Sequence, residues 1–175
     1  TLEIPACTEV YFGGGAGIFV KGDLNVQGTK ECPAIFRHIR LESFYDDLPG
    51  QWAGLFILRG SKNSVIKYAE ILNSDFGLSV GSTDARIDSA QDFIDAFSFA
   101  NRPVVTVENT LIKNSLANCI SGFLSEINAF DCVMYNAGDY LASFSFGGIY
   151  RIEGCTFANY GSPEINHQTS TILLS

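Results

Sequence analysis

The sequence predicts an all-β fold in which short strands wind into a solenoid, a coil of stacked turns. Three observations support this prediction: the composition disfavours helices, short stretches alternate in polarity, and a segment ending on asparagine repeats. The 175 residues include 17 glycines and one methionine, and 46% are hydrophobic against 17% charged. This composition argues against intrinsic disorder and suits a single packed domain.

The first expected strands lie within residues 17–28, GIFVKGDLNVQG. Ile18, Val20, Leu24 and Val26 recur there with the period of two that is typical of half-buried strands. Glycine or proline interrupts the chain at turn-like intervals, at 13–15, 22, 28, 49–50, 60 and 147–148. The pattern therefore predicts strands of only a few residues each.

Four segments superpose on a terminal asparagine, at Asn73, Asn114, Asn136 and Asn159, with spacings of 41, 22 and 23 residues. The residue two positions before each asparagine is apolar, and the residue four positions before it is small. The apolar set is Ile71, Ile112, Met134 and Phe157, and the small set is Ala69, Thr110, Cys132 and Cys155. Such columns predict turns of 22 to 23 residues with three short strands each, whose like side chains stack in the interior.

The recurring asparagine suits a tight corner, because it tolerates the left-handed backbone conformation and bonds to its own backbone. In register, its side-chain amide can also bond to the asparagine of the next turn, as in the ladders of cross-β structure. A β-sandwich, which also has short strands at regular spacing, is the structural alternative.

Two stretches resemble known proteins. Residues 2–36, from LEIPACTEV to CPAIF, resemble the opening of right-handed parallel β-helix proteins of the pectate-lyase-like superfamily. Residues 36–74, from FRHIRLESFYDDLPGQW to EILNS, resemble a group of predicted surface lipoproteins of Bacteroidetes. The resemblance implies that residues 1–175 form one right-handed, single-stranded parallel β-helix domain, a portion of a longer protein. It also implies an extracytoplasmic location, at the cell surface or anchored to the outer membrane.

Two segments are expected to leave the coil: a loop at residues 37–52 and an insert at residues 84–102. The spacing of apolar residues in the insert predicts a short amphipathic helix near residues 84–100. Its apolar side would carry Ile87, Ala90, Ile94 and Phe97. The chain ends on TILLS, an apolar strand-like segment. Because an open coil end exposes unpaired strand edges, we expect further coils, a cap or a partner chain to cover it.

Charge and hydropathy argue against two classes of interaction. With 19 acidic and 11 basic residues the net charge is −8, and the absence of a Lys/Arg stripe argues against a nucleic-acid partner. No apolar run approaches the roughly 18 residues of a membrane span, so the chain is not expected to span a membrane.

The five cysteines, Cys7, Cys32, Cys119, Cys132 and Cys155, contain no CxxC pair and no histidine at a zinc-site spacing. Neither a metal nor a cofactor is therefore expected. Cys132 and Cys155 fall in one column of successive turns. A buried stack of two thiols is the first interpretation, and a disulfide between them is the alternative, since parallel Cβ vectors suit a disulfide poorly.

No catalytic residue is assigned. Glu108 and Glu153 share a column two turns apart, with Phe130 between them. Their expected separation of about 9–10 Å lies at or beyond the largest carboxylate separation of an inverting acid–base pair. A solvated polar face, neutralised by Lys67 or Arg151, is the simpler interpretation. The resemblance adds that polygalacturonase-like members carry Asn-Thr-Asp, Gly-His-Gly and Arg-Ile-Lys motifs, and none of these strings occurs in this chain.

The candidate ligand-binding residues lie in the loop at 37–52: Phe44, Tyr45, Asp46, Asp47, Gln51 and Trp52. Aromatic faces beside carboxylates and amides are what sugar recognition uses, since C–H faces stack on rings while hydroxyls find acceptors. The alternative is that Trp52 and Phe44 cover an end of the core, because tryptophan is usually buried.

These observations predict a non-catalytic, surface-exposed module that binds a glycan or a cell-surface partner protein. One alternative is a polysaccharide lyase or hydrolase of the β-helix superfamily. The other is a structural subunit of a cell-surface assembly.

Overall fold

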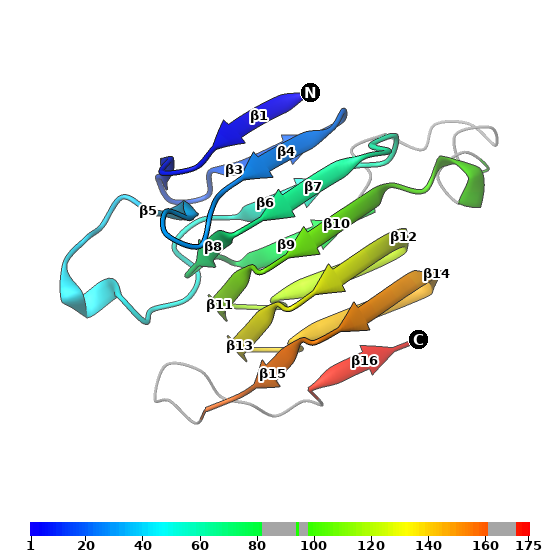
Figure 1. The fold of residues 1–175 in the computed structure, drawn as a ribbon. Coiled ribbons are helices and arrows are strands. Elements are labelled where there is room, and N and C mark those ends of the chain that lie inside the picture. The colour runs from blue at the N-terminus through cyan, green and yellow to red at the C-terminus, as the bar shows by residue number, and fades with distance from the viewer. Residues whose placement is uncertain (82–93, 95–97, 161–170) are drawn as a thin grey trace.

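Parallel strands make up almost all of the regular structure (Figure 1). The computed structural model describes residues 1–81, 94, 98–160 and 171–175, and every strand pair in these ranges is parallel. The same ranges contain two 3-10 helices, η1 (Ser43–Tyr45) and η2 (Phe99–Asn101). The all-β prediction is confirmed.

Successive strands of the chain belong in turn to three sets, and the strands of one set pair with one another. We call these sets the first, second and third file. The first file contains β1 (Leu2–Pro5), β4 (Leu24–Gln27), β7 (Ser64–Lys67), β10 (Val104–Glu108) and the C-terminal parts of β12 (Ile120–Phe130) and β14 (Ala142–Glu153). The second file contains β2 (Glu9–Phe12), β5 (Ala34–His38), β8 (Ala69–Leu72), β11 (Leu111–Ser115), β13 (Val133–Ala137) and β15 (Thr156–Ala158). The third contains β3 (Gly17–Val20), β6 (Gly54–Ile57), β9 (Phe76–Val80), the N-terminal parts of β12 and β14, and β16 (Ile172–Leu174).

The second file is a six-stranded sheet, whereas β12 and β14 join the first and third files into a ten-stranded sheet. Figure 1 shows successive strands of each file lying one below the other, with β1 and β16 at opposite ends. Because each strand pairs with the strand one repeat away, segments far apart in sequence lie side by side.

The register of these pairs agrees with the columns found in the sequence. Ile112 pairs with Ile71 on one side and with Met134 on the other, and Met134 pairs with Phe157. Ile71, Ile112 and Met134 are fully buried, and Phe157 packs half-buried against them at the end of the core. Burial of one such side chain contributes about 1.5–3 kcal/mol, so the apolar columns drive the packing of turn on turn.

Three of the four asparagines that end the repeats have the expected left-handed backbone, with φ of 63° at Asn73, 55° at Asn114 and 57° at Asn136, whereas Asn159 does not. Asn114 Nδ2 donates to Asn73 Oδ1 at 3.4 Å, and Asn136 Nδ2 donates to Asn114 Oδ1 at 3.2 Å. Asn159 extends the series, since its Oδ1 accepts the backbone N–H of Ala137 at 3.2 Å. We call this series the asparagine ladder.

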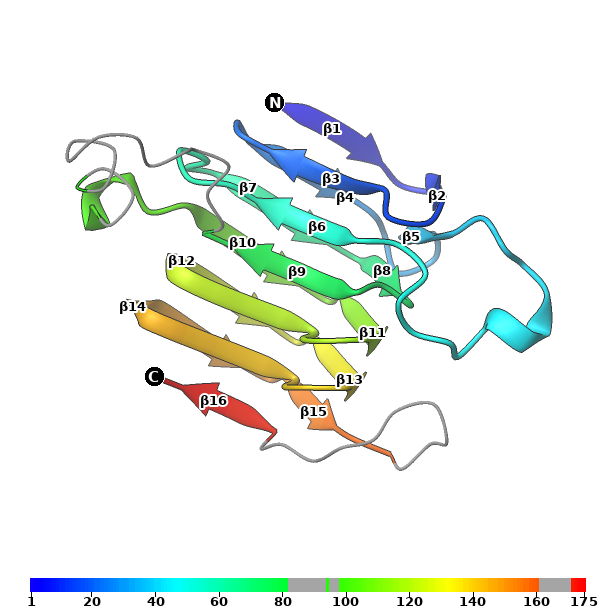
Figure 2. The same ribbon diagram turned by 180° about the vertical axis from the view of Figure 1, so that it is seen from behind.

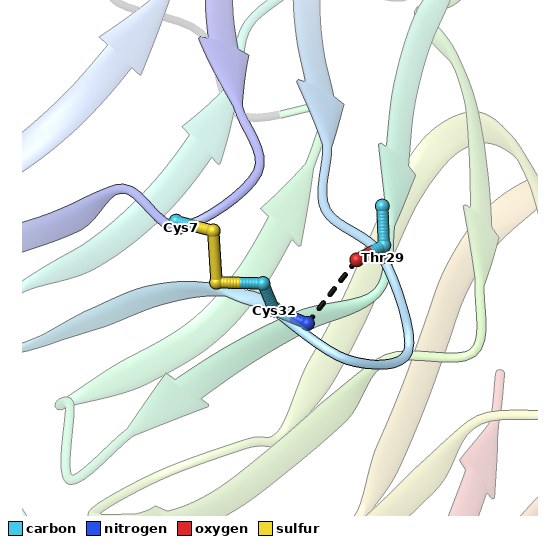
Figure 3. Close-up of a disulfide and its surroundings, with 3 residues drawn as sticks. All are labelled: Cys7, Thr29 and Cys32. Carbon is cyan, nitrogen blue, oxygen red and sulfur yellow. Dashed lines mark hydrogen bonds between the residues drawn. A yellow bond between two sulfur atoms is a disulfide. The ribbon is translucent and has the colours of Figure 1, made fainter.

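A disulfide joins Cys7 to Cys32, whose Cα atoms lie 4.9 Å apart in neighbouring turns (Figure 3). Thr29 Oγ1 accepts the backbone N–H of Cys32 at 3.1 Å and fixes the turn that carries it. This pair is not predicted by the repeat pattern, because the asparagine that aligns the later repeats is absent from the first two turns. The paired residues Phe12 and His38 occupy that column in the first two turns.

Cys119, Cys132 and Cys155 are free thiols, so the alternative disulfide between Cys132 and Cys155 is absent. Of the two thiols expected to be buried, Cys132 is buried and Cys155 is half-buried. Cys132 Sγ donates to the carbonyl oxygens of Phe130 at 3.2 Å and Val107 at 3.5 Å. Burial raises the pKa of the Cys119 and Cys132 thiols to about 12. Both therefore remain neutral at physiological pH and pack as small hydrophobes.

The last strand, β16, pairs with β14, and its other edge has no strand partner in the described ranges. Leu174 in this strand is 77% exposed. A cover for this edge, from further coils or from a partner, stays a prediction.

The insert at 84–102 is described only in part. Ile87, Ala90 and Phe97, which carry the predicted amphipathic helix, lie outside the described residues. Among the residues that are described, no helix has the length and apolar character needed to cross a bilayer.

The native protein should contain one disulfide and three free thiols. Denatured without reductant, it should react with three equivalents of a thiol reagent, and with five after reduction. Peptide mapping by mass spectrometry should place the link between Cys7 and Cys32. Five reactive thiols before reduction, or a link through Cys132 or Cys155, would contradict the structure.

Replacing Asn114 by alanine should lower the free energy of unfolding by about 2–5 kcal/mol. Alanine loses about 1–2 kcal/mol in the left-handed conformation, and the ladder partners left unpaired cost about 1–3 kcal/mol. Asn114→Gly is the matched control, because glycine accepts this backbone conformation freely and loses only the hydrogen bonds. Urea unfolding measures both variants. Equal stability of alanine variant and wild type would show that the ladder contributes nothing.

Candidate functional site

The loop between β5 and β6 projects from the stacked strands, as both ribbon views show (Figures 1 and 2). Strand β5 ends at His38, which lies in the asparagine column because Phe36, two positions earlier, pairs with Ile71. Where later repeats turn this corner on an asparagine, the chain here leaves the sheet through residues 39–50.

The asparagine ladder anchors the loop to the scaffold. Asn73 Nδ2 donates to the carbonyl oxygens of Tyr45 at 2.7 Å and Asp46 at 2.8 Å. Asn114 Nδ2 donates to Asp47 Oδ1 at 3.0 Å. The first amides of the ladder therefore bind the loop, which fixes the position of η1.

Trp52 closes the loop and lies in the core. It is 0% exposed, its Nε1 donates to the Leu72 carbonyl at 2.7 Å, and its ring stacks on Phe12 at a centroid distance of 4.2 Å. The prediction that Trp52 contacts a ligand is therefore wrong. The alternative, that Trp52 and Phe44 cover an end of the core, is correct for Trp52, which is fully enclosed, and wrong for Phe44, which is exposed. Gln51 is half-buried beside it, and its Nε2 donates to the Pro49 carbonyl at 3.2 Å.

The other predicted residues lie at the outer surface of the loop. Phe44 is 78% exposed and stands edge-on to Tyr45, with ring centroids 5.2 Å apart. Arg40 orients Tyr45, because its guanidinium lies 4.7 Å above the ring and donates to the hydroxyl at 2.6 Å. The side chains of Asp46 and Asp47 are 55% and 77% exposed. Four of the six predicted residues, Phe44 to Asp47, thus follow one another in the loop, with Tyr45 half-buried and the other three exposed.

Beneath the loop is a cavity of about 260 Å³. It is lined by Arg37, His38, Asp46, Asp47, Leu72, Asn73 and Lys113. At its rim, an Arg37 guanidinium nitrogen lies 3.8 Å from Asp46 Oδ1, and Lys113 Nζ lies 3.5 Å from Asp47 Oδ1. We call this the loop cavity. Two carboxylates and two cations balance the charge around it.

His38 is the most buried ionisable group of the loop cavity, with 2% of its surface exposed. Its Nδ1 accepts the backbone N–H of Arg40 at 3.1 Å, so in the neutral ring the proton is on Nε2. Burial, and next the charge of Arg37, lower the pKa of His38, while the nearby Tyr45 backbone and the Asp46 carboxylate oppose the shift. The imidazole is therefore neutral at physiological pH.

Sequence reasoning did not assign Arg37, His38 or Lys113 to the site. The available signal was the register: His38 falls in the column that asparagine occupies in later repeats, which makes it a buried corner residue.

A wider hollow of about 480 Å³ lies over the corners between the first and second files, beside Tyr68, Asn109 and Asp131. None of the buried polar atoms that lack a partner in the described residues belongs to its lining. Two of those atoms, His38 Nε2 and Arg37 Nε, belong to residues that line the loop cavity. The loop cavity is therefore the better candidate site.

The two glutamates considered for catalysis are engaged in ion pairs. Glu108 Oε2 lies 3.0 Å from Lys67 Nζ, and Glu153 Oε1 lies 2.6 Å from Arg151 Nε. Phe130 separates them in the register, as expected. Within the described part of the chain, no group of three His, Cys, Asp or Glu side chains is placed to hold a metal ion.

Comparison of the chain with protein-family models, curated proteins and solved structures finds no match. The site is therefore interpreted from its own geometry.

Protonation of His38 should destabilise the fold. Its folded-state pKa lies below the ordinary value of 6.5, so the unfolded chain binds more protons between the two values. This contribution to stability should be complete above about pH 6.5 and be lost as the pH falls through the lower folded-state pKa.

The variant His38→Asn carries the asparagine that later repeats have at this position. Its free energy of unfolding should not show the loss at low pH that His38 causes. Urea unfolding of wild type and variant across this pH range measures the difference. Parallel pH profiles would show that the titration of His38 is not linked to folding.

Proposed function

We propose that this chain is part of a right-handed, single-stranded parallel β-helix and acts as a non-catalytic module that binds glycans through the loop at 37–52. The three recurring files of parallel strands support the β-helix, since each turn of such a fold contributes one strand to each sheet. The register step of one repeat between neighbouring strands supports it further.

The observation that carries the glycan proposal is an exposed aromatic ring beside two exposed carboxylates on an anchored loop. Phe44 offers a ring face for the C–H face of a sugar, and Asp46 and Asp47 offer acceptors for its hydroxyls. Because Asn73 and Asn114 already hold this loop, binding costs little further ordering of the chain.

An oxidising, extracytoplasmic compartment is part of the proposal. The Cys7–Cys32 disulfide supports it, because disulfides persist mainly outside the reducing cytosol. Attachment to the cell surface, as in the resembling lipoproteins of Bacteroidetes, stays a prediction.

A second candidate function is a structural subunit of a cell-surface assembly. This candidate stays a prediction. The ion-paired Glu108 and Glu153 give the polysaccharide lyase or hydrolase alternative no comparable support.

A glycan array should identify oligosaccharides that bind the wild-type chain. Phe44→Ala should weaken this binding about tenfold, since an aromatic stacking contact contributes about 0.5–1.5 kcal/mol. Phe19→Ala is the matched control, because Phe19 is 61% exposed but lies on β3, outside the loop. Glycan binding that both variants retain would remove the loop from the site. Binding of a protein and of no glycan would favour the partner-protein form of the module.

A further inference from the structure

We infer that the glycan is a neutral oligosaccharide that extends from the loop at 37–52, across the outer face of the second file, into the hollow at the corners between the first and second files. We call this hollow of about 480 Å³ the corner hollow. The inference rests on the proposed function and names the class of glycan and a second subsite for it. It follows from the position of the corner hollow, its free polar groups and the backbone of Tyr68.

The corner hollow and the loop cavity adjoin on one face of the second file. On β8, Glu70 lines the corner hollow and Leu72 lines the loop cavity. On β11, Leu111 and Lys113 do the same. Residues two apart in a strand point to the same side and lie about 7 Å apart, and only one inward-facing residue of each strand comes between them. The ribbon views also show the loop beside the second file (Figures 1 and 2), so one extended ligand can occupy both hollows.

The polar groups of the corner hollow are available to a ligand. Four polar side chains that line it are those of Tyr68, Glu70, Asn109 and Asp131. The last two are exposed and the first two are half-buried. None of the four has a hydrogen-bond or ion-pair partner in the described residues, and none of their atoms is among the buried ones that lack a partner. Their oxygens therefore reach the surface, where sugar hydroxyls can bond to them.

Tyr68 occupies a backbone position that its residue type does not favour. Its φ is 47°, and the residues at the same corner of the next turns are Asn109 at 49°, Asp131 at 53° and Gly154 at 65°. Asparagine, aspartate and glycine accept the left-handed conformation, whereas a bulky side chain makes it costly. Such strain concentrates at functional sites. The ring of Tyr68 gives the corner hollow a platform for the C–H face of a sugar, which the later corner residues lack.

The charges and the size of the corner hollow fit neutral sugars. Glu70 and Asp131 outnumber Lys30 in its lining, and the whole chain has a net charge of −8. A chain of uronic acids would bring one carboxylate per sugar beside these groups, so repulsion would weaken its binding. The volume lies within the roughly 300–1,000 Å³ of small-molecule pockets, which is enough for sugar units.

The length of the glycan tests this inference on the chain as it exists. The probes are malto-, cello-, laminari- and manno-oligosaccharides, from monosaccharide to pentasaccharide, with oligogalacturonates as the charged comparison. Ligand-observed NMR titration should show, in at least one neutral series, an affinity that rises about tenfold from mono- to tetrasaccharide, as expected for a second stacking contact. Oligogalacturonates of equal length should bind more weakly.

Variants assign this gain to Tyr68. Tyr68→Asn carries the residue of the next turn at this corner, so it should fold and unfold at a higher urea concentration than the wild type. It should lose about three- to tenfold in affinity for the longer glycans and leave monosaccharide binding unchanged. Tyr68→Phe keeps the ring and should retain the gain. Phe44→Ala should weaken every member of a series by the same factor.

An affinity that does not rise with glycan length would overturn the inference, as would a gain that survives in folded Tyr68→Asn. Tighter binding of oligogalacturonates than of every neutral series would also overturn it. Array glycans that depend on Phe44 but not on Tyr68 would leave the proposed function standing while this inference fails. Binding that depends on Tyr68 alone, or no sugar binding in either assay, would overturn both.

Discussion

One corner of the chain holds successive turns in register, because a backbone conformation and a side-chain hydrogen bond coincide there. The left-handed φ at Asn73, Asn114 and Asn136 lets the chain turn tightly, and the amide of each asparagine reaches the next. Asparagine is one of few residues that satisfy both requirements, since it tolerates this conformation and both donates and accepts. The apolar columns beside the corner are aligned by the same register and complete the core.

The first two turns lack this device and are joined by other means. Phe12 and His38 stand in the asparagine column there. The Cys7–Cys32 disulfide links these turns covalently, and Trp52 stacks on Phe12 across them. The N-terminal end therefore depends on cross-links and aromatic packing, whereas the later turns depend on amide hydrogen bonds.

The loop at 37–52 lies between the first two turns, which the disulfide and aromatic packing join, and the later turns, which the asparagine ladder joins. At His38 the chain leaves the sheet, and the first two amides of the asparagine ladder, on Asn73 and Asn114, bind the departing loop. The asparagine corner therefore also supports the loop that carries the exposed side chains. The same geometry buries His38 beneath the loop and leaves Arg37 half-buried at the loop cavity. Structural support and candidate recognition share the same residues.

The sequence by itself determined the all-β class, the column register and the left-handed asparagine corners, because these depend on residue type at a fixed repeat. It also indicated which loop leaves the repeat. Only the tertiary structure decided that Trp52 is enclosed, that Cys7 pairs with Cys32, and that His38 and Arg37 line a cavity. These facts depend on contacts between residues far apart in the chain, such as Asp47 with Asn114, 67 positions later. The local sequence pattern does not predict such contacts, since they form only when the turns are stacked and the loop folds back on them.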